Sequence, residues 1–157
     1  LIELMVVIII IGVVMVVAYP RFSGLVMKRR LMGVCGRLAG SLDYIRGREV
    51  ADRTIYYVNF NRRKNQYWVT RQAGSEEEKM AGRLGIPQSF PEDIFLKKIK
   101  LETRPVTSST SAVRFYPRGN SDGAMLYLET TGGDQASIRV KPYTGRCQIF
   151  NYYKSFL

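Results

Sequence analysis

The sequence predicts an α+β fold in which a long N-terminal helix packs on an antiparallel β-sheet. Three observations predict it. Residues 1–19 are almost wholly apolar, residues 27–45 carry apolar side chains at steps of three and four, and the chain after Arg53 consists of short β-branched and aromatic runs. A helix followed by strands is the order typical of an α+β domain, in which the helix covers one face of the sheet.

The chain has 157 residues, which is enough for about one domain. We therefore expect three consecutive parts: residues 1–24 as a transmembrane or filament-core helix, residues 25–53 as an amphipathic helix, and residues 54–157 as a β-rich globular head.

The segment Leu1–Tyr19 has the length of a membrane span. As a helix it rises about 28 Å at 1.5 Å per residue, close to the ~30 Å hydrocarbon thickness of a bilayer. A secretory signal peptide has a basic first region and a small-residue cleavage site. Neither feature is present, and we expect a retained anchor.

Glu3 is the only charge in this segment. A carboxylate in a membrane helix costs roughly 2.5–3.5 kcal/mol at mid-bilayer, so such a group usually has a partner. Two interpretations stay open from the residues alone: Glu3 meets a positive group of another chain, or it lies at the interface and caps the helix N-terminus, where the dipole favours negative charge.

Pro20 and Gly24 follow the apolar segment. Proline removes a backbone donor and disfavours helix at the preceding residue. The sequence therefore predicts a kink or local melting of the helix here, a hinge where the chain leaves the membrane.

The amphipathic pattern after Gly24 predicts a helix to about Asp52. Gly33, Gly36 and Gly40 lie near one face of it. Either another backbone approaches this face closely, or the helix tolerates these glycines because a sheet supports it.

Strand patterns fill the rest of the chain. A hairpin with a basic tip is predicted from residues 54–60 and 66–70, and residues 73–93 are expected to form a long surface loop or a short helix. Further strands are expected near residues 97–106, 112–116, 124–129, 136–141 and 147–152.

The net charge of +11 is concentrated after the apolar segment. Such a basic excess suits phospholipid headgroups, acidic neighbours or nucleic acid. The candidate nucleic-acid or headgroup-binding residues are Lys28, Arg29, Arg30, Arg62, Arg63, Lys64 and Arg146.

No motif points to catalysis or to a cofactor. The chain has no histidine, no G-x-S-x-G and no phosphate-binding glycine loop, which argues against an enzyme. Cys35 and Cys147 do not form a metal-binding C-x-x-C pair. They are either a possible disulfide, if the head lies in an oxidising compartment, or two buried thiols.

The first 22 residues, LIELMVVIIIIGVVMVVAYPRF, strongly resemble the N-terminus of mature type IV pilins and pseudopilins. These proteins begin, after leader cleavage, with an aromatic residue and a Thr or Ser before Leu-Ile-Glu-Leu. The resemblance implies that the leader and two mature residues precede Leu1, that Glu3 pairs with the N-terminal amine of a neighbouring subunit during assembly, and that Pro20 is the family's helix-breaking proline.

The head resembles the GspH/FimT group of minor pseudopilins and pilins. Residues 113–121, VRFYPRGNS, are similar to its Phe-x-Pro-x-Gly stretch, and residues 137–140 and 144–146 to its closing strand and Gly-Arg. The resemblance implies a single-pass protein of the bacterial inner membrane with a periplasmic head, whose partners are other pseudopilins or pilins. We expect a minor pseudopilin of type II secretion.

The alternative is a FimT-like minor pilin that binds DNA during uptake. Exposed cations and nearby aromatic side chains are typical of single-strand binding. DNA-binding members of the group carry Gly-Arg-x-Arg, however, and Gly145-Arg146-Cys147-Gln148 lacks the second arginine. Nucleic acid is therefore a possible partner that the sequence does not favour.

Overall fold

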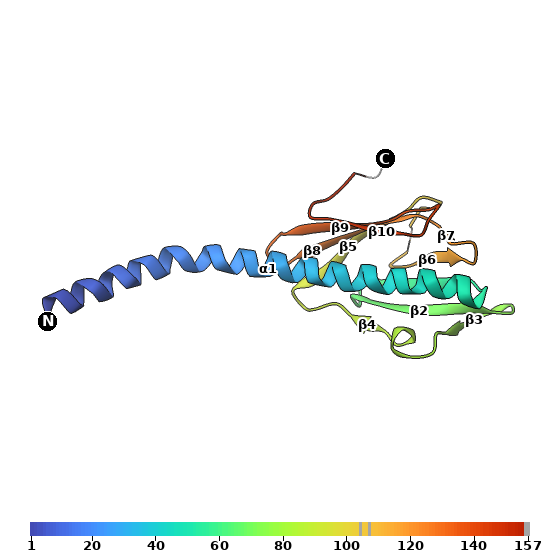
Figure 1. Cartoon of the computed structure of the whole chain (residues 1–157), viewed down its shortest axis with the longest axis horizontal. Coiled ribbons are helices and arrows are strands. Elements are labelled where there is room, and N and C mark those ends of the chain that lie inside the picture. The colour runs from blue at the N-terminus through green and yellow to red at the C-terminus, as the bar shows by residue number, and fades with distance from the viewer. Residues whose placement is uncertain (104, 107, 156–157) are drawn as a thin grey trace.

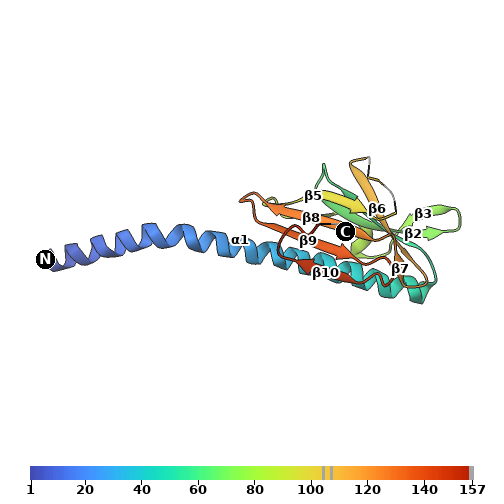
Figure 2. The same cartoon turned by 90° about the horizontal axis from the view of Figure 1, so that it is seen from above.

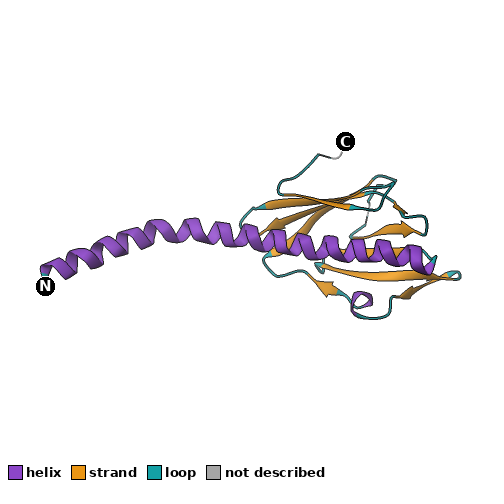
Figure 3. Cartoon of the chain, viewed as in Figure 1, coloured by secondary structure: helices purple, strands orange, loops and turns teal. Residues whose placement is uncertain are grey.

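One long helix and two antiparallel sheets make up the structure, a computed structural model (Figure 1, Figure 3). It describes residues 1–103, 105–106 and 108–155, and for residues 17–23 it describes the backbone alone. The predicted α+β class, a long N-terminal helix on antiparallel strands, is confirmed. The division of the strands between two sheets was not predicted.

Helix α1 runs from Ile2 to Asp52 without a break. It therefore continues through Pro20 and Gly24, and the local melting predicted there is not observed. The side chain of Pro20 lies outside the described part. The ribbon curves gently along its free half, which projects away from the head (Figure 1). The helix ends where Arg53 adopts the left-handed conformation, φ 49°, a common way for a helix to terminate.

The first sheet has the strand order β3-β2-β1-β6-β7, with β4 also paired to β2. Its strands are β1 (Tyr56–Asn61), β2 (Gln66–Ala73), β3 (Glu76–Lys79), β4 (Gln88–Ser89), β6 (Thr110–Tyr116) and β7 (Asn120–Ser121). The short 3-10 helix η1 (Arg83–Gly85) lies between β3 and β4. Burial alternates along β1, as expected for a strand with one face on the core.

The second sheet has the order β10-β9-β8-β5. Its strands are β5 (Ile94–Leu101), β8 (Ala124–Thr130), β9 (Gln135–Val140) and β10 (Cys147–Phe150). Strand β8 is buried on both faces, because residues after β10 cover the outer one. There the Tyr127 hydroxyl donates to the carbonyl of Lys154 at 3.0 Å, and Tyr153 packs edge-on to Tyr127.

The C-terminal half of α1 joins the two sheets into one core. It contacts β1, β6, β8, β9 and β10 (Figure 2). The predicted apolar stripe is the buried face. Leu31, Leu38, Leu42 and Ile45 are each at most 1% exposed. A second link between the sheets is Asn65, whose side chain donates to the carbonyl of Ile94 at 2.7 Å and accepts from the amide of Leu96 at 3.1 Å.

The acidic run Glu76–Glu78 was expected in a surface loop or short helix, and that expectation was wrong. These residues form strand β3, paired with β2. Two side-chain contacts hold the pairing besides the backbone: Thr70 donates to Glu77 at 3.0 Å, and Arg71 donates to Glu78 at 3.4 Å in a salt bridge. Glu77 and Glu78 are thus held by side chains of β2, and these partners cannot be recognised from the periodicity of the sequence.

Two strand boundaries also differ from the expectation. Strand β5 begins earlier than predicted and ends at Leu101, and residue 104, within the predicted 97–106 strand, lies outside the described residues. Strand β10 ends at Phe150, because the following residues turn to cover β8 and β9. Ser137, for example, donates to the carbonyl of Tyr152 at 2.8 Å.

Truncating Leu42 tests whether the helix stripe holds the head together. Leu42→Ala removes a fully buried side chain, and we expect the free energy of unfolding to fall by about 2–5 kcal/mol. Leu25→Ala, at a position 48% exposed, should change it by less than about 0.5 kcal/mol. Urea unfolding of the full chain in mild detergent measures both. Equal effects would contradict the assigned core.

Candidate functional site

The N-terminal part of α1 is an apolar helix that the rest of the chain leaves uncovered. All of residues 1–16 are exposed. The exposure involves every side of the helix, from Ile2 at 81% through Ile8 at 67% to Met15 at 65%. A helix that is apolar all round is stable when it is buried on all sides, in a large protein core or a membrane. This segment is therefore the surface most in need of a partner.

In the part of the chain that the structure describes, no helix meets the length and hydropathy expected of a membrane-spanning segment.

Glu3 lies in the first turn of α1, on this exposed segment. The position puts a carboxylate beside the unpaired amides and positive dipole end of the helix. Among the described residues no salt bridge to Glu3 forms within the chain. If the surrounding apolar side chains are buried, this carboxylate is buried with them, and it then needs a positive group from outside the chain.

The predicted basic residues are not gathered on one surface. Lys28, Arg29 and Arg30 lie where α1 enters the head, and Arg30 is paired with Asp93 at 3.0 Å. Arg146 lies in the turn between β9 and β10, next to Gly145, where an added Cβ would lie 3.0 Å from Cδ of Arg46. Seventeen residues of helix separate Arg29 from Arg46, a rise of about 26 Å.

The third basic group, Arg62, Arg63 and Lys64, lies in the exposed turn between β1 and β2. Its conformation is set by Asn61, whose side-chain oxygen accepts from the amide of Lys64 at 3.0 Å. The three basic groups therefore lie on three separate elements. Arg30, being paired with Asp93, is also less available to a phosphate than the sequence suggested.

Both cysteines are free thiols, so the possible Cys35–Cys147 disulfide is not formed in this structure. Burial raises the pKa of Cys35 to about 11. Burial, together with the nearby Asp43, raises the pKa of Cys147 to about 12. Because the thiolate is the reactive form, both side chains are poor nucleophiles at neutral pH. Within the described residues, no three His, Cys, Asp or Glu side chains are grouped to hold a metal ion.

A buried carboxylate that the sequence analysis missed is Glu49, near the C-terminal end of α1. It is fully buried, and within the described structure neither side-chain oxygen has a hydrogen-bond partner. Burial raises the pKa of Glu49 to about 8, although Arg46, one turn earlier, opposes the shift. Glu49 continues the buried stripe of Leu42 and Ile45 at helical spacing, the one sequence signal that could have revealed its burial.

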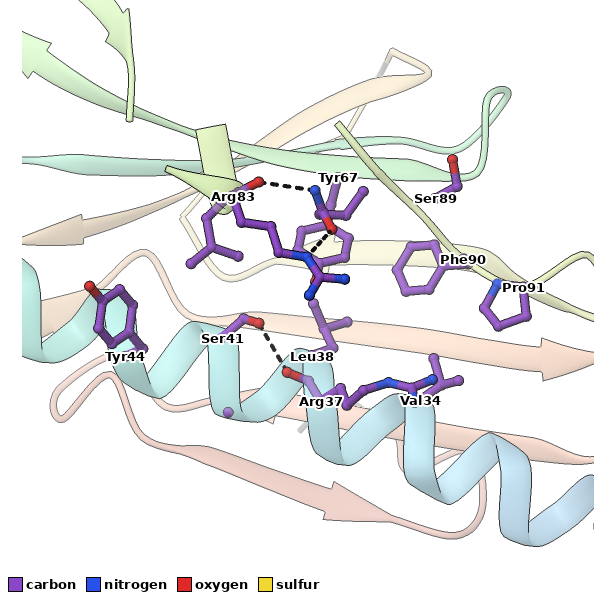
Figure 4. A pocket seen from close by; sticks show the side chains of 13 residues that line it. Val34, Arg37, Leu38, Ser41, Tyr44, Tyr67, Arg83, Ser89, Phe90 and Pro91 are labelled. Carbon is purple, nitrogen blue, oxygen red and sulfur yellow. Dashed lines mark hydrogen bonds between the residues drawn. The ribbon is translucent and has the colours of Figure 1, made fainter. Parts of the chain in front are cut away.

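The helix face opposite the buried stripe is open. A Cβ built on Gly33, Gly36 or Gly40 would meet no atom within 4 Å. The described residues therefore show no other backbone of the same chain packed closely against these glycines, which was one of the two interpretations. Beside Gly40 lies a cavity of the head, which α1 forms together with η1 and the segment around β4 (Figure 4).

The comparisons with known proteins concern the fold. No protein-family model matches the chain, and no curated protein matches it. Solved structures do match it, and two of them are of the minor pseudopilin EpsH from the type II secretion system of Vibrio cholerae. One covers 78% of this chain and 97% of its own at a TM-score of 0.63, the other 82% and 99% at 0.64, each with 10% sequence identity. The chain thus has a pseudopilin-like fold, as the resemblance predicted.

Replacing Glu49 tests the buried carboxyl. With a pKa of 4.5 in the unfolded chain and about 8 in the folded one, the folded state holds more protons between these values, so the contribution of Glu49 to stability is lost as pH rises through this window. Glu49→Gln should match the wild type near pH 4.5 and exceed its stability by a few kcal/mol above pH 8.

Unfolding by urea at several pH values measures the difference between the two proteins, and Glu92→Gln, at an exposed position, is the matched control. A difference that does not change with pH would show that Glu49 is not protonated in the folded chain.

Proposed function

We propose that this chain is a minor pseudopilin subunit of a type II secretion pseudopilus, which takes part in filament assembly and protein export. Residues 1–24 anchor it in the bacterial inner membrane and then enter the filament core, and residues 54–157 form a periplasmic head. The observation that carries the proposal is an exposed apolar helix with a single carboxylate, continuous with a head of pseudopilin-like fold.

The apolar helix supports both stages of this role, which are anchoring in the membrane before assembly and packing in the filament core afterwards. Burial of an apolar side chain such as Ile or Leu is worth about 1.5–3 kcal/mol, and more than a dozen such side chains are exposed along residues 1–16. A bilayer can bury them before assembly, and the helices of neighbouring subunits can bury them afterwards. The exposed Lys28 and Arg29 follow this segment, where cations favour anionic lipid headgroups.

Glu3 gives the assembly step its specificity. Between packed helices, water no longer screens its charge, so attraction to a positive group is stronger than in solution. The N-terminal amine of an adjacent subunit is the partner that the resemblance implies. A pair of this kind fixes the axial register between two smooth apolar helices, because any other register leaves a buried carboxylate unpaired.

The continuous helix carries this register into the head. The same α1 whose first half is exposed has its second half buried against both sheets. A subunit that is positioned by its N-terminal segment is therefore also positioned at its head surface. The role proposed here is structural: the chain is a subunit of a filament whose growth moves cargo, and it catalyses no reaction.

Replacing Glu3 tests the proposal. Glu3→Ala should still insert into the membrane, because it removes a charge from an apolar helix. Assembly with sibling pseudopilins and secretion of cargo should fall by about tenfold or more, since about 1.4 kcal/mol of lost pairing is enough for that change. Glu3→Gln, which keeps the shape, should behave like Glu3→Ala.

Membrane fractionation, co-purification with sibling subunits and the amount of exported cargo measure these effects. Glu92→Ala, at an exposed acid of the head, serves as the control and should behave like the wild type. Normal assembly and export by both Glu3 variants would refute the role given to this carboxylate.

A further inference from the structure

A cavity in the head carries positive charge. It has a volume of about 540 Å³ and opens between α1, η1 and β4 (Figure 4). Its lining includes Arg37, Gly40 and Tyr44 from the exposed side of α1 and Arg83 from η1. No Asp or Glu belongs to the part of the lining that the structure describes. Among the described residues neither arginine has a salt bridge.

Arg83 is held in position for an external ligand. Its Nε donates to the side-chain oxygen of Gln88 at 3.3 Å, and the Gln88 amide donates back to the carbonyls of Arg83 and Ile86, both at 3.0 Å. The terminal guanidinium nitrogens remain for other acceptors. They point toward the centre of the cavity in Figure 4. A guanidinium fixed in this way loses less entropy when it binds a carboxylate.

The tight turn that carries Arg83 is also fixed. A Cβ on Gly85 would lie 1.8 Å from the carbonyl oxygen of Met80, so this position accepts only glycine. The wall behind Arg83 is apolar, formed by Tyr67 and Phe90 with ring centroids 5.5 Å apart. Carboxylates bound between arginines and an apolar wall are partly shielded from water, which strengthens the charge-assisted hydrogen bonds.

The chain itself carries an acidic segment that fits this site. Strand β3 contains Glu76, Glu77 and Glu78, all exposed, the longest acidic run in a chain of net charge +11. Within the described structure, the partners of Glu77 and Glu78 lie on the adjacent strand β2, and Glu76 has no salt bridge. Figure 1 shows β3 and β4 on the same side of α1, with β3 nearer the C-terminal end of the helix.

We infer that the Arg37–Arg83 pocket binds the acidic β3 strand of a second copy of this chain. The inference rests on the proposed filament role. Since the strand and the pocket lie at different heights along α1, they can meet between two parallel copies that are displaced along the helix axis. Such a contact is heterologous: the strand of one copy meets the pocket of the other, and the two copies are not related as in a closed dimer.

Zero-length cross-linking tests the contact directly. Arg37→Lys and Arg83→Lys keep the charge and supply an amine that a carbodiimide can couple to a carboxylate. Equal amounts of ¹⁴N- and ¹⁵N-labelled full chain are mixed in detergent micelles and cross-linked, and the peptides are identified by mass spectrometry. We expect cross-links from residue 37 or 83 to Glu76–Glu78 that join the two labels. Arg63→Lys, an exposed cation outside the pocket, should give none.

Filling the pocket provides a second, independent variant. Gly40→Leu places a side chain in the pocket, where the structure has open space, and should lower the yield of mixed-label cross-links by about tenfold. Gly47→Leu, at an equally open glycine of α1 outside the pocket, is the matched control and should leave the yield unchanged. Both changes favour helix, so neither is expected to unfold the head.

The outcomes separate this inference from the proposed function. Cross-links that join only identical labels, or a yield that Gly40→Leu does not lower, would overturn the pocket contact. A chain that assembles with sibling subunits but gives no mixed-label cross-link would overturn the pocket contact and leave the filament role standing. Failure to assemble with any subunit, itself included, would overturn both.

Discussion

The structure depends on one unmet requirement, which is that the apolar half of α1 must be removed from water by something other than its own chain. The head is complete without this segment, because its core is built from residues 31–45 of the helix and from the two sheets. Residues 1–16 contribute nothing to that core and remain exposed on every side. The hydrophobic effect therefore acts between this chain and its surroundings, and Glu3 is the one polar group that restricts which surroundings are acceptable.

The helix also determines what the rest of the molecule can do. It is a single element of 51 residues. Its exposed N-terminal half and its C-terminal half, which packs on the sheets, therefore cannot move independently unless α1 bends or unfolds. Both sheets are attached to its second half, and Asn65 ties them to each other. The pocket beside Gly40 and the acidic strand β3 are thereby held at set heights relative to Glu3. A register fixed at the N-terminal end becomes a register between head surfaces.

Much of this architecture could be predicted from the residues, since periodicity identifies which side chains are buried. The stripe Leu31–Ile45 is buried as expected, and each of the seven predicted strands overlaps a strand of the structure. Periodicity does not state which strands pair, so the division into two sheets and the pairing of β3 through Arg71 and Glu78 were missed. The pocket was missed for a related reason: Arg37 and Arg83 are far apart in sequence, and only the fold brings them to one cavity. Local melting of the helix was also predicted at Pro20, because the prediction did not take into account that the residues on both sides of Pro20 are helical.

The central claim, that residues 1–16 are buried by a membrane or by sister helices, is tested most directly by cysteine accessibility in cells. Single cysteines at Val7 and Ile10 are treated with a membrane-impermeant maleimide. The native Cys35 and Cys147 give little background because burial raises their pKa values to about 11 and 12. We predict no labelling at positions 7 and 10 in membranes or in isolated filaments, and full labelling of a cysteine at the exposed Tyr143. Rapid labelling at position 7 or 10 in both states would contradict the account.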